Sequence, residues 1–203
     1  MELKERILSE AFQMFMKSGI RSVTMDQISN YMGISKRTLY EIFREKNELL
    51  REGIEYFSNI RRAEARHIIE TSGNVIEAIY ILITKGEEMR QQINPMFFED
   101  IRKYLPEIHH HITTEGRMRE YSFTLEVLKK GVREGIFKGD LDLEMVNAFI
   151  HQMMNIVLQE DVFPKDQYSH EDIFKNIMMP YLSGISTEKG KEQILKYFEK
   201  EIR

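Results

Sequence analysis

Residues 24–43, TMDQISNYMGISKRTLYEIF, predict two short helices joined by a tight turn. Thr24 is a favourable first cap, and Gln27, three residues later, completes a capping box. Gly33 follows the first helix, at a point where the chain must turn through a conformation that glycine adopts readily. Ser35 is then a natural cap for the second helix. The spacing therefore predicts a helix-turn-helix.

The second of these helices is expected to have an apolar back and a polar front. Leu39, Ile42 and Phe43 share one face and should be buried. A short helix that presents cations and hydroxyls on its other face fits the major groove of DNA. The alternative is a helical hairpin whose charged face is merely solvated. We predict DNA contacts from Thr24, Ser35, Lys36, Arg37, Thr38, Tyr40, Arg44 and Lys46.

These residues also carry a family resemblance. Residues 33–43 followed by 46–50, KNELL, resemble the recognition helix and next helix start of the TetR family of bacterial repressors. The resemblance covers about residues 3–55 and extends to an upstream set, namely Ile7, Leu8, Ala11, Phe12, Phe15 and Gly19. It implies a homodimer that binds a palindromic operator in double-stranded DNA and responds to a small-molecule effector. Where the family often has an aromatic residue or histidine, this chain has Ile42, which we expect to be core.

Composition limits the class of protein. The chain has 203 residues, 42% of them hydrophobic and 31% charged, which is typical of a globular protein with a genuine core. It has no cysteine, so disulfides, thiol nucleophiles and cysteine zinc sites are excluded. No apolar run is long enough to span a membrane, and the N-terminus lacks a signal-peptide segment. We therefore expect a cytoplasmic protein with no membrane partner.

The net charge of −4 hides an uneven distribution. Residues 1–48 carry eight Lys or Arg against seven Asp or Glu, whereas the rest of the chain carries 21 against 26. Within 35–46 the ratio is four basic residues to two acidic ones. Positive charge is thus concentrated at the helix tip, and DNA affinity should depend on local contacts.

The whole chain reads as helical, so the predicted fold class is all-α. We expect a three-helix DNA-binding domain at 1–45 and a regulatory domain for ligand binding and dimerisation at 46–203. With only four prolines, helix ends are indicated mainly by glycines and capping residues. The helices after the motif are expected at about 46–71, 75–93, 96–103, 106–134, 142–158, 169–182 and 188–202.

The chain lacks the motifs of catalysis or cofactor binding. It has no Gly-x-Gly-x-x-Gly, P-loop or nucleophile elbow, so we expect neither an enzyme nor a cofactor. Consecutive histidines 109–111 point in different directions on a helix, which disfavours a metal site. Glu99, Asp100 and Glu107 are expected to be ordinary surface charges of helices.

A ligand cavity is implied by the resemblance and by the methionine- and phenylalanine-rich central helices. Core packing is the alternative role for each such residue. The effector is expected to be small and largely apolar, and to act by tilting the long helix after residue 46. Its candidate contacts are Met89, Phe97, Phe98, Tyr104, His109, His110, Tyr121 and Met153.

Two wide apolar helix faces predict a homodimer, and the alternative is that both belong to an internal core. The first face consists of Leu143, Val146, Ile150, Met153, Met154, Val157 and Leu158. The second consists of Ile173, Phe174, Ile177, Met178, Tyr181 and Leu182. The function predicted from all this is a ligand-released transcriptional repressor. The alternative is a helical enzyme or ligand-binding bundle with a vestigial helix-turn-helix.

Overall fold

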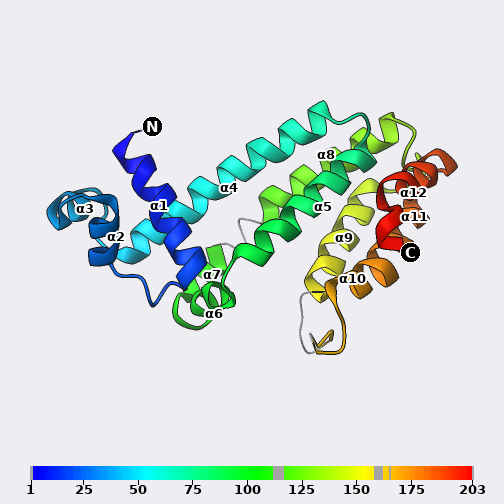
Figure 1. Ribbon diagram of the computed structural model, residues 1–203. Coiled ribbons are helices and arrows are strands. Elements are labelled where there is room, and N and C mark those ends of the chain that lie inside the picture. Colours follow the sequence, from blue (N-terminus) through cyan, green and yellow to red (C-terminus); the bar gives the residue numbers. More distant parts are fainter. Residues whose placement is uncertain (1, 112–116, 158–161, 165, 203) are drawn as a thin grey trace. The chain divides into compact units, whose positions relative to one another are not determined.

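The protein is helical along nearly its whole length, as predicted (Figure 1). The structure, a computed structural model, describes residues 2–111, 117–157, 162–164 and 166–202. The helices in chain order are α1 (Leu3–Ser18), α2 (Met25–Met32), α3 (Lys36–Ile42), α4 (Lys46–Thr71), α5 (Val75–Gln92), α6 (Pro95–Tyr104), α7 (Pro106–His111), α8 (Arg117–Arg133), α9 (Leu143–Val157), α10 (His170–Ile173), the π-helical η2 (Phe174–Met178), α11 (Met179–Ile185) and α12 (Glu188–Ile202). In the described ranges no helix is both long and apolar enough to cross a membrane.

Most predicted helix boundaries agree with the structure to within a few residues. Asp142 caps α9 by accepting from the backbone N–H of Glu144 and Met145, at 3.0 and 3.1 Å. Ser169 and Asp172 form a reciprocal cap before α10, again as the spacing indicates. The expected helix at 106–134 corresponds to α7 and α8, and the five residues between them lie outside the described part.

The chain forms two compact units. Unit 1 comprises Met1–His67 and Thr84–Thr114, and unit 2 comprises Ile68–Ile83 and Glu115–Arg203. Helices α4 and α5 each contribute to both units, so at two crossings the chain passes from one unit to the other within a helix. The third crossing, between residues 114 and 115, lies outside the described residues. The predicted domain boundary near residue 46 lies inside unit 1, because the core of the N-terminal helices continues into α4, α6 and α7.

The core of unit 1 centres on Phe12 of α1. Its ring lies 4.5 Å from that of Phe57 on α4 and 5.6 Å, edge to face, from that of Phe97 on α6. Leu49 and Leu50, in the first turn of α4, are also fully buried in this core. Buried aromatic and aliphatic side chains therefore join the helix-turn-helix to α4 and α6 within a single hydrophobic cluster.

Unit 2 has its own core, built from α8, α9, α11 and α12 together with the start of α5. Two short non-helical segments pair beside this core, where Phe137 forms an isolated antiparallel bridge with Ser186. Lys138 N–H donates to Ile185 O at 3.0 Å, and Thr187 N–H donates to Ile136 O at 2.9 Å. These bonds satisfy backbone groups that would otherwise be buried without partners.

Candidate nucleic-acid interface

Local hydrogen bonds build the helix-turn-helix as its sequence predicts. The Thr24 hydroxyl accepts from Gln27 N–H at 3.2 Å, and the Gln27 side chain accepts from Thr24 N–H at 2.8 Å. Gly33 ends α2 in the left-handed region, at φ 66° and ψ 30°, where a side chain would be strained. The Ser35 hydroxyl then accepts from Thr38 N–H at 3.0 Å and caps α3. The predicted helix caps at Thr24 and Ser35 and the predicted turn at Gly33 are all confirmed.

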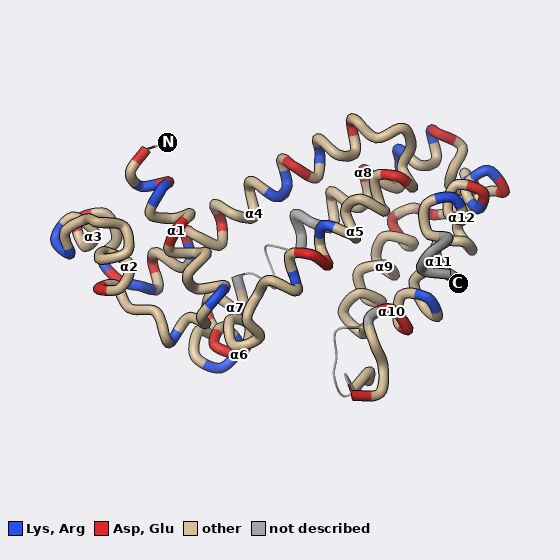
Figure 2. Tube along the Cα trace, in the orientation of Figure 1, with Lys and Arg blue, Asp and Glu red and all other residues tan. Residues whose placement is uncertain are grey.

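The buried back of α3 sets which side chains remain outside. Leu39 and Phe43 are fully buried, and Ile42 is half-buried against the same core, as expected from its departure from the family pattern. The opposite face exposes Tyr40, whose accessible fraction is 48%. The exposed charged residues of this face and its end are Lys36, Arg37, Glu41 and Arg44. Figure 2 shows a basic segment on α3, at the left of the view.

The cations on α3 are held by nearby carboxylates that the sequence analysis did not single out. Lys36 forms an ion pair with Asp26 of α2, and Arg37 Nε donates to Glu41 Oε1 at 2.8 Å. The (i, i+4) spacing of Arg37 and Glu41 indicates the second pair from sequence. The first pair depends on the packing of α2 against α3, so no local spacing reveals it.

Four of the predicted DNA-contacting residues border a single open hollow between α2, the end of α3 and the start of α4. Its volume is about 420 Å³. The lining residues are Thr24, Met25, Asp26, Tyr40, Arg44, Glu45 and Lys46. The structure thus brings Thr24, Tyr40, Arg44 and Lys46 together, while Ser35, Lys36, Arg37 and Thr38 lie at the N-terminal end of α3.

Lys46 has a structural role besides lining this hollow. Its ammonium donates to Ile20 O at 3.1 Å and to Val23 O at 3.0 Å, which ties α4 to the loop before α2. Burial lowers the pKa of the Lys46 ammonium, the nearby Asp100 carboxylate opposes this shift, and Arg21 adds to it. Two of the three ammonium donors are therefore occupied by the protein's own carbonyls.

The loop between α1 and α2 is also held by α6. Asp100 is 2% exposed, and its Oδ2 accepts from Arg21 N–H at 2.9 Å. The expectation that Asp100 is a surface charge is therefore wrong, because α6 packs this side chain against the loop. Gly19, at φ 82°, allows the close approach, since a Cβ there would lie 3.2 Å from Met96 Cβ. The Arg21 guanidinium lies 4.5 Å from the centre of the Tyr104 ring.

The eight predicted ligand contacts are divided between the two units. Six belong to unit 1, whereas Tyr121 and Met153 belong to unit 2. Phe97 is packed inside the core of unit 1, while Phe98 and Tyr104 are more than half exposed. The sulfur of Met89 lies 2.8 Å from Arg61 Nη1, and His109 and His110 lie exposed on α7.

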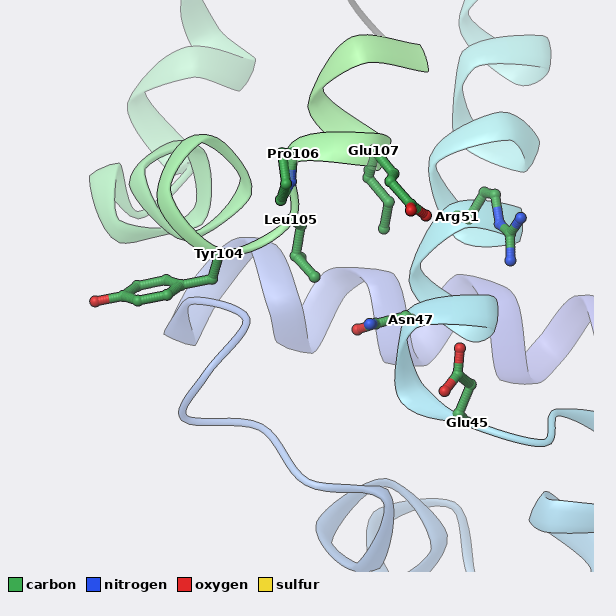
Figure 3. Close-up of a pocket in the computed structure, with 8 residues that line it drawn as sticks. Glu45, Asn47, Arg51, Tyr104, Leu105, Pro106 and Glu107 are labelled. Atoms are coloured by element: carbon green, nitrogen blue, oxygen red, sulfur yellow. The ribbon is translucent and has the colours of Figure 1, made fainter.

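A half-open pocket of about 420 Å³ lies in unit 1 between the start of α4 and α6–α7 (Figure 3). Its lining residues are Glu45, Asn47, Arg51, Tyr104, Leu105, Pro106, Glu107 and Ile108. Tyr104 is the one predicted ligand residue in this lining, and its ring points away from the polar groups of α4. The carboxylates and the guanidinium of this pocket suit a polar molecule better than the expected apolar effector.

Among the described side chains, no three histidines or carboxylates are grouped to hold a metal ion. The side chain of His111 lies outside the described part, so the histidine run is described only at His109 and His110.

Comparisons with known proteins agree with this geometry. Residues 7–52 match the family model of the bacterial regulatory proteins of the tetR family. The chain is 23% identical over 190 residues to HTH-type transcriptional repressor KstR2 of Mycolicibacterium smegmatis, with 92% of each chain covered. It is 27% identical over 147 residues to KstR2 of Mycobacterium tuberculosis, covering 71% of this chain and 74% of that one.

Solved structures show the same fold. A transcriptional regulator from Cytophaga hutchinsonii matches 90% of this chain and 98% of its own, with a TM-score of 0.72 at 17% identity. A TetR-family regulator from Marinobacter aquaeolei matches all of both chains, with a TM-score of 0.68 at 17% identity. The architecture and the N-terminal motif define a helix-turn-helix regulator. Its N-terminal part, residues 7–52, matches the tetR family of bacterial regulatory proteins, and most of the chain is similar to named HTH-type transcriptional repressors.

Proposed function

We propose that this regulator is a repressor that binds a palindromic operator as a homodimer and leaves it when a small molecule binds. The observation that carries the proposal is the front of α3, where cations, hydroxyls and an exposed tyrosine lie opposite the fully buried Leu39 and Phe43. The relatives named as transcriptional repressors support repression, rather than activation, of transcription.

The proposed contacts divide into two groups along α3. Ser35, Lys36, Arg37 and Thr38 lie at its N-terminal end, from which recognition helices reach base edges. Thr24, Tyr40, Arg44 and Lys46 surround the open hollow at its other end, where their hydroxyls and cations are proposed to contact a phosphate of the flanking strand. Of the two carboxylates in the same lining, that of Asp26 is paired with Lys36. Lys46 contributes there mainly by fixing the loop, since its ammonium already binds two carbonyls.

Dimerisation is proposed through α9 and the α10–η2–α11 segment. The side chains of Met145, Phe149, Met154 and Ile156 are all more than two-fifths exposed on α9. An exposed apolar helix face of this kind is typical of protein–protein contact. A dimer would read two half-sites about 34–36 Å apart. Of the residues predicted for the α9 face, Leu143, Val146 and Ile150 pack against the core of unit 2 and Met153 is buried, so only Met154 belongs to both the predicted and the exposed face. Leu158 lies outside the described part.

For the effector, we propose a site in unit 2 beside Tyr121 and Met153. Asn147 is fully buried, and its Nδ2 donates to Tyr121 O at 2.9 Å. Its Oδ1 has no hydrogen-bond partner among the described residues. A largely apolar effector with one hydroxyl or amine could donate to this oxygen, since an unpaired buried acceptor is costly.

The DNA-binding proposal is tested by gel shift on a palindromic fragment selected from the upstream region of the gene. Lys36→Ala and Tyr40→Ala should weaken binding while leaving the folded state intact. Lys85→Ala is the matched control, because Lys85 also forms an exposed ion pair, with Glu64 of α4. If both α3 variants bind like the parent protein, the assignment of the contacts is wrong.

The alternative, a helical enzyme or ligand-binding bundle with a vestigial motif, predicts no specific DNA complex. Specific binding should also fall steeply with salt, because phosphate contacts release counterions. Effector binding is tested separately by thermal stabilisation with apolar compounds, followed by operator release with those that stabilise. Asn147→Ala should reduce stabilisation by a hydroxyl- or amine-bearing compound and leave stabilisation by its purely apolar analogue unchanged.

A further inference from the structure

Arg37 and Glu41 form an ion pair at the most exposed part of α3. The accessible fractions of their side chains are 88% and 60%, so neither is needed for the core. The pair joins Arg37 Nε to Glu41 Oε1 at 2.8 Å, across one turn of the helix. Exposed pairs of this kind contribute little to stability. The pair lies on the front of the helix proposed to enter DNA, so its role is sought in DNA recognition.

The geometry of the bond leaves the recognition groups available. Because Glu41 accepts from Nε, both terminal Nη groups of Arg37 keep their donors, and among the described residues neither has a protein partner. These two groups form the planar fork that binds the O6 and N7 atoms of guanine. The side bond to Glu41 restricts the rotation of the guanidinium, so less conformational freedom is lost on binding.

The carboxylate also argues against a phosphate as the partner of Arg37. A phosphate beside Glu41 would face a negative charge one helix turn away, whereas the guanine edge carries no net charge. Lys36 differs from Arg37 in this respect, because its ammonium is a point charge without a planar fork. Although Lys36 is also paired with a carboxylate, that of Asp26, its ammonium cannot present the planar pair of donors that the Arg37 guanidinium presents to a base.

We propose that Arg37 and Glu41 act together to select guanine at one position of each operator half-site. Arg37 donates to guanine O6 and N7, and Glu41 is a positioning residue that orients the guanidinium and disfavours binding to phosphates. This inference rests on the proposed DNA-binding function, and it assigns a role to Glu41 that the motif alone does not indicate.

The test is selection of binding sites from a randomised double-stranded DNA pool, followed by affinity measurements on single-position variants of the selected site. The parent protein should select a palindrome with a guanine at one symmetric position. Arg37→Ala should reduce the preference for that guanine by about 5- to 150-fold and leave the preferences elsewhere unchanged. Glu64→Gln is the matched control, because it removes the charge of an exposed carboxylate in a lysine pair remote from α3.

The Glu41→Ala variant distinguishes two roles of this carboxylate, namely positioning of the Arg37 guanidinium and simple repulsion of DNA phosphates. It should lower the preference for the guanine and at the same time raise affinity for unrelated DNA, because a negative charge is lost near the phosphates. A rise in affinity for all sequences with an unchanged preference would overturn the role of Glu41. An unchanged preference in Arg37→Ala would overturn the inference while leaving the proposed function intact. Failure of the parent protein to select any DNA would instead refute the proposed function itself.

Discussion

Helices α3 and α9 both bury one face, but their exposed faces are chemically opposite. The front of α3 carries Lys36, Arg37 and Tyr40, whereas α9 exposes Met145 and Phe149, with accessible fractions of 70% and 52%. A polar front with forked and hydroxyl donors suits a nucleic acid, and an apolar front suits another protein surface. The two helices therefore indicate different partners, although both are amphipathic and each packs into a hydrophobic core.

The largest effect is expected from the buried side of α3. Leu39→Ala should lower the free energy of unfolding by about 2–5 kcal/mol, because the removed side chain is fully buried between α3 and its neighbours. Tyr40→Ala, one residue away on the front, should change it by about 0.5 kcal/mol or less. Chemical denaturation measures both variants. Equal destabilisation would show that the front of α3 is not free for a partner.

The corresponding test on α9 places a charge on its exposed apolar face. Phe149→Glu should weaken self-association by about 2–4 kcal/mol, because a carboxylate would be buried in the proposed interface. Light scattering at micromolar concentration should then detect monomers. Leu195→Glu on α12 is the control, since Leu195 is also exposed and apolar but lies outside the proposed interface. A monomeric parent protein would contradict the dimer directly.

The contact of α6 with the loop before α2 provides a smaller test within unit 1. Asp100→Ala removes the acceptor of Arg21 N–H and should cost about 1–3 kcal/mol of unfolding free energy. Asp100→Asn keeps an acceptor oxygen and should cost less. If both variants are as stable as the parent protein, the loop is held by Lys46 and packing alone.

The smallest expected effect is at the cap of α2. Thr24→Ala should destabilise unit 1 by about 1 kcal/mol, through loss of the bond to Gln27 N–H. Thr24→Ser retains the hydroxyl and should restore most of this stability. DNA affinity measured on the same variants shows whether Thr24 also contacts the operator. If Thr24 contacts the operator, the Thr24→Ala protein binds DNA more weakly than the parent protein even under conditions where it is fully folded.

Sequence spacing alone was enough for the local features of the motif. Thr24, Gly33 and Ser35 act where they were predicted because their hydrogen bonds and turn conformations involve residues within three or four positions. The buried face of α3 followed for the same reason, since helical periodicity determines which side chains share a face. The all-α class and most helix ends were predictable on these grounds.

Only the tertiary structure decided which distant groups meet. Lys46 binds carbonyls more than twenty residues away, and Arg21 N–H is bonded to Asp100 across 79 residues of sequence. The eight expected ligand residues were likewise divided between two units, and Phe97 was placed in a core. Spacing cannot reveal such contacts, because they depend on how whole helices pack, and a similar apolar side chain can fill a core or line a cavity.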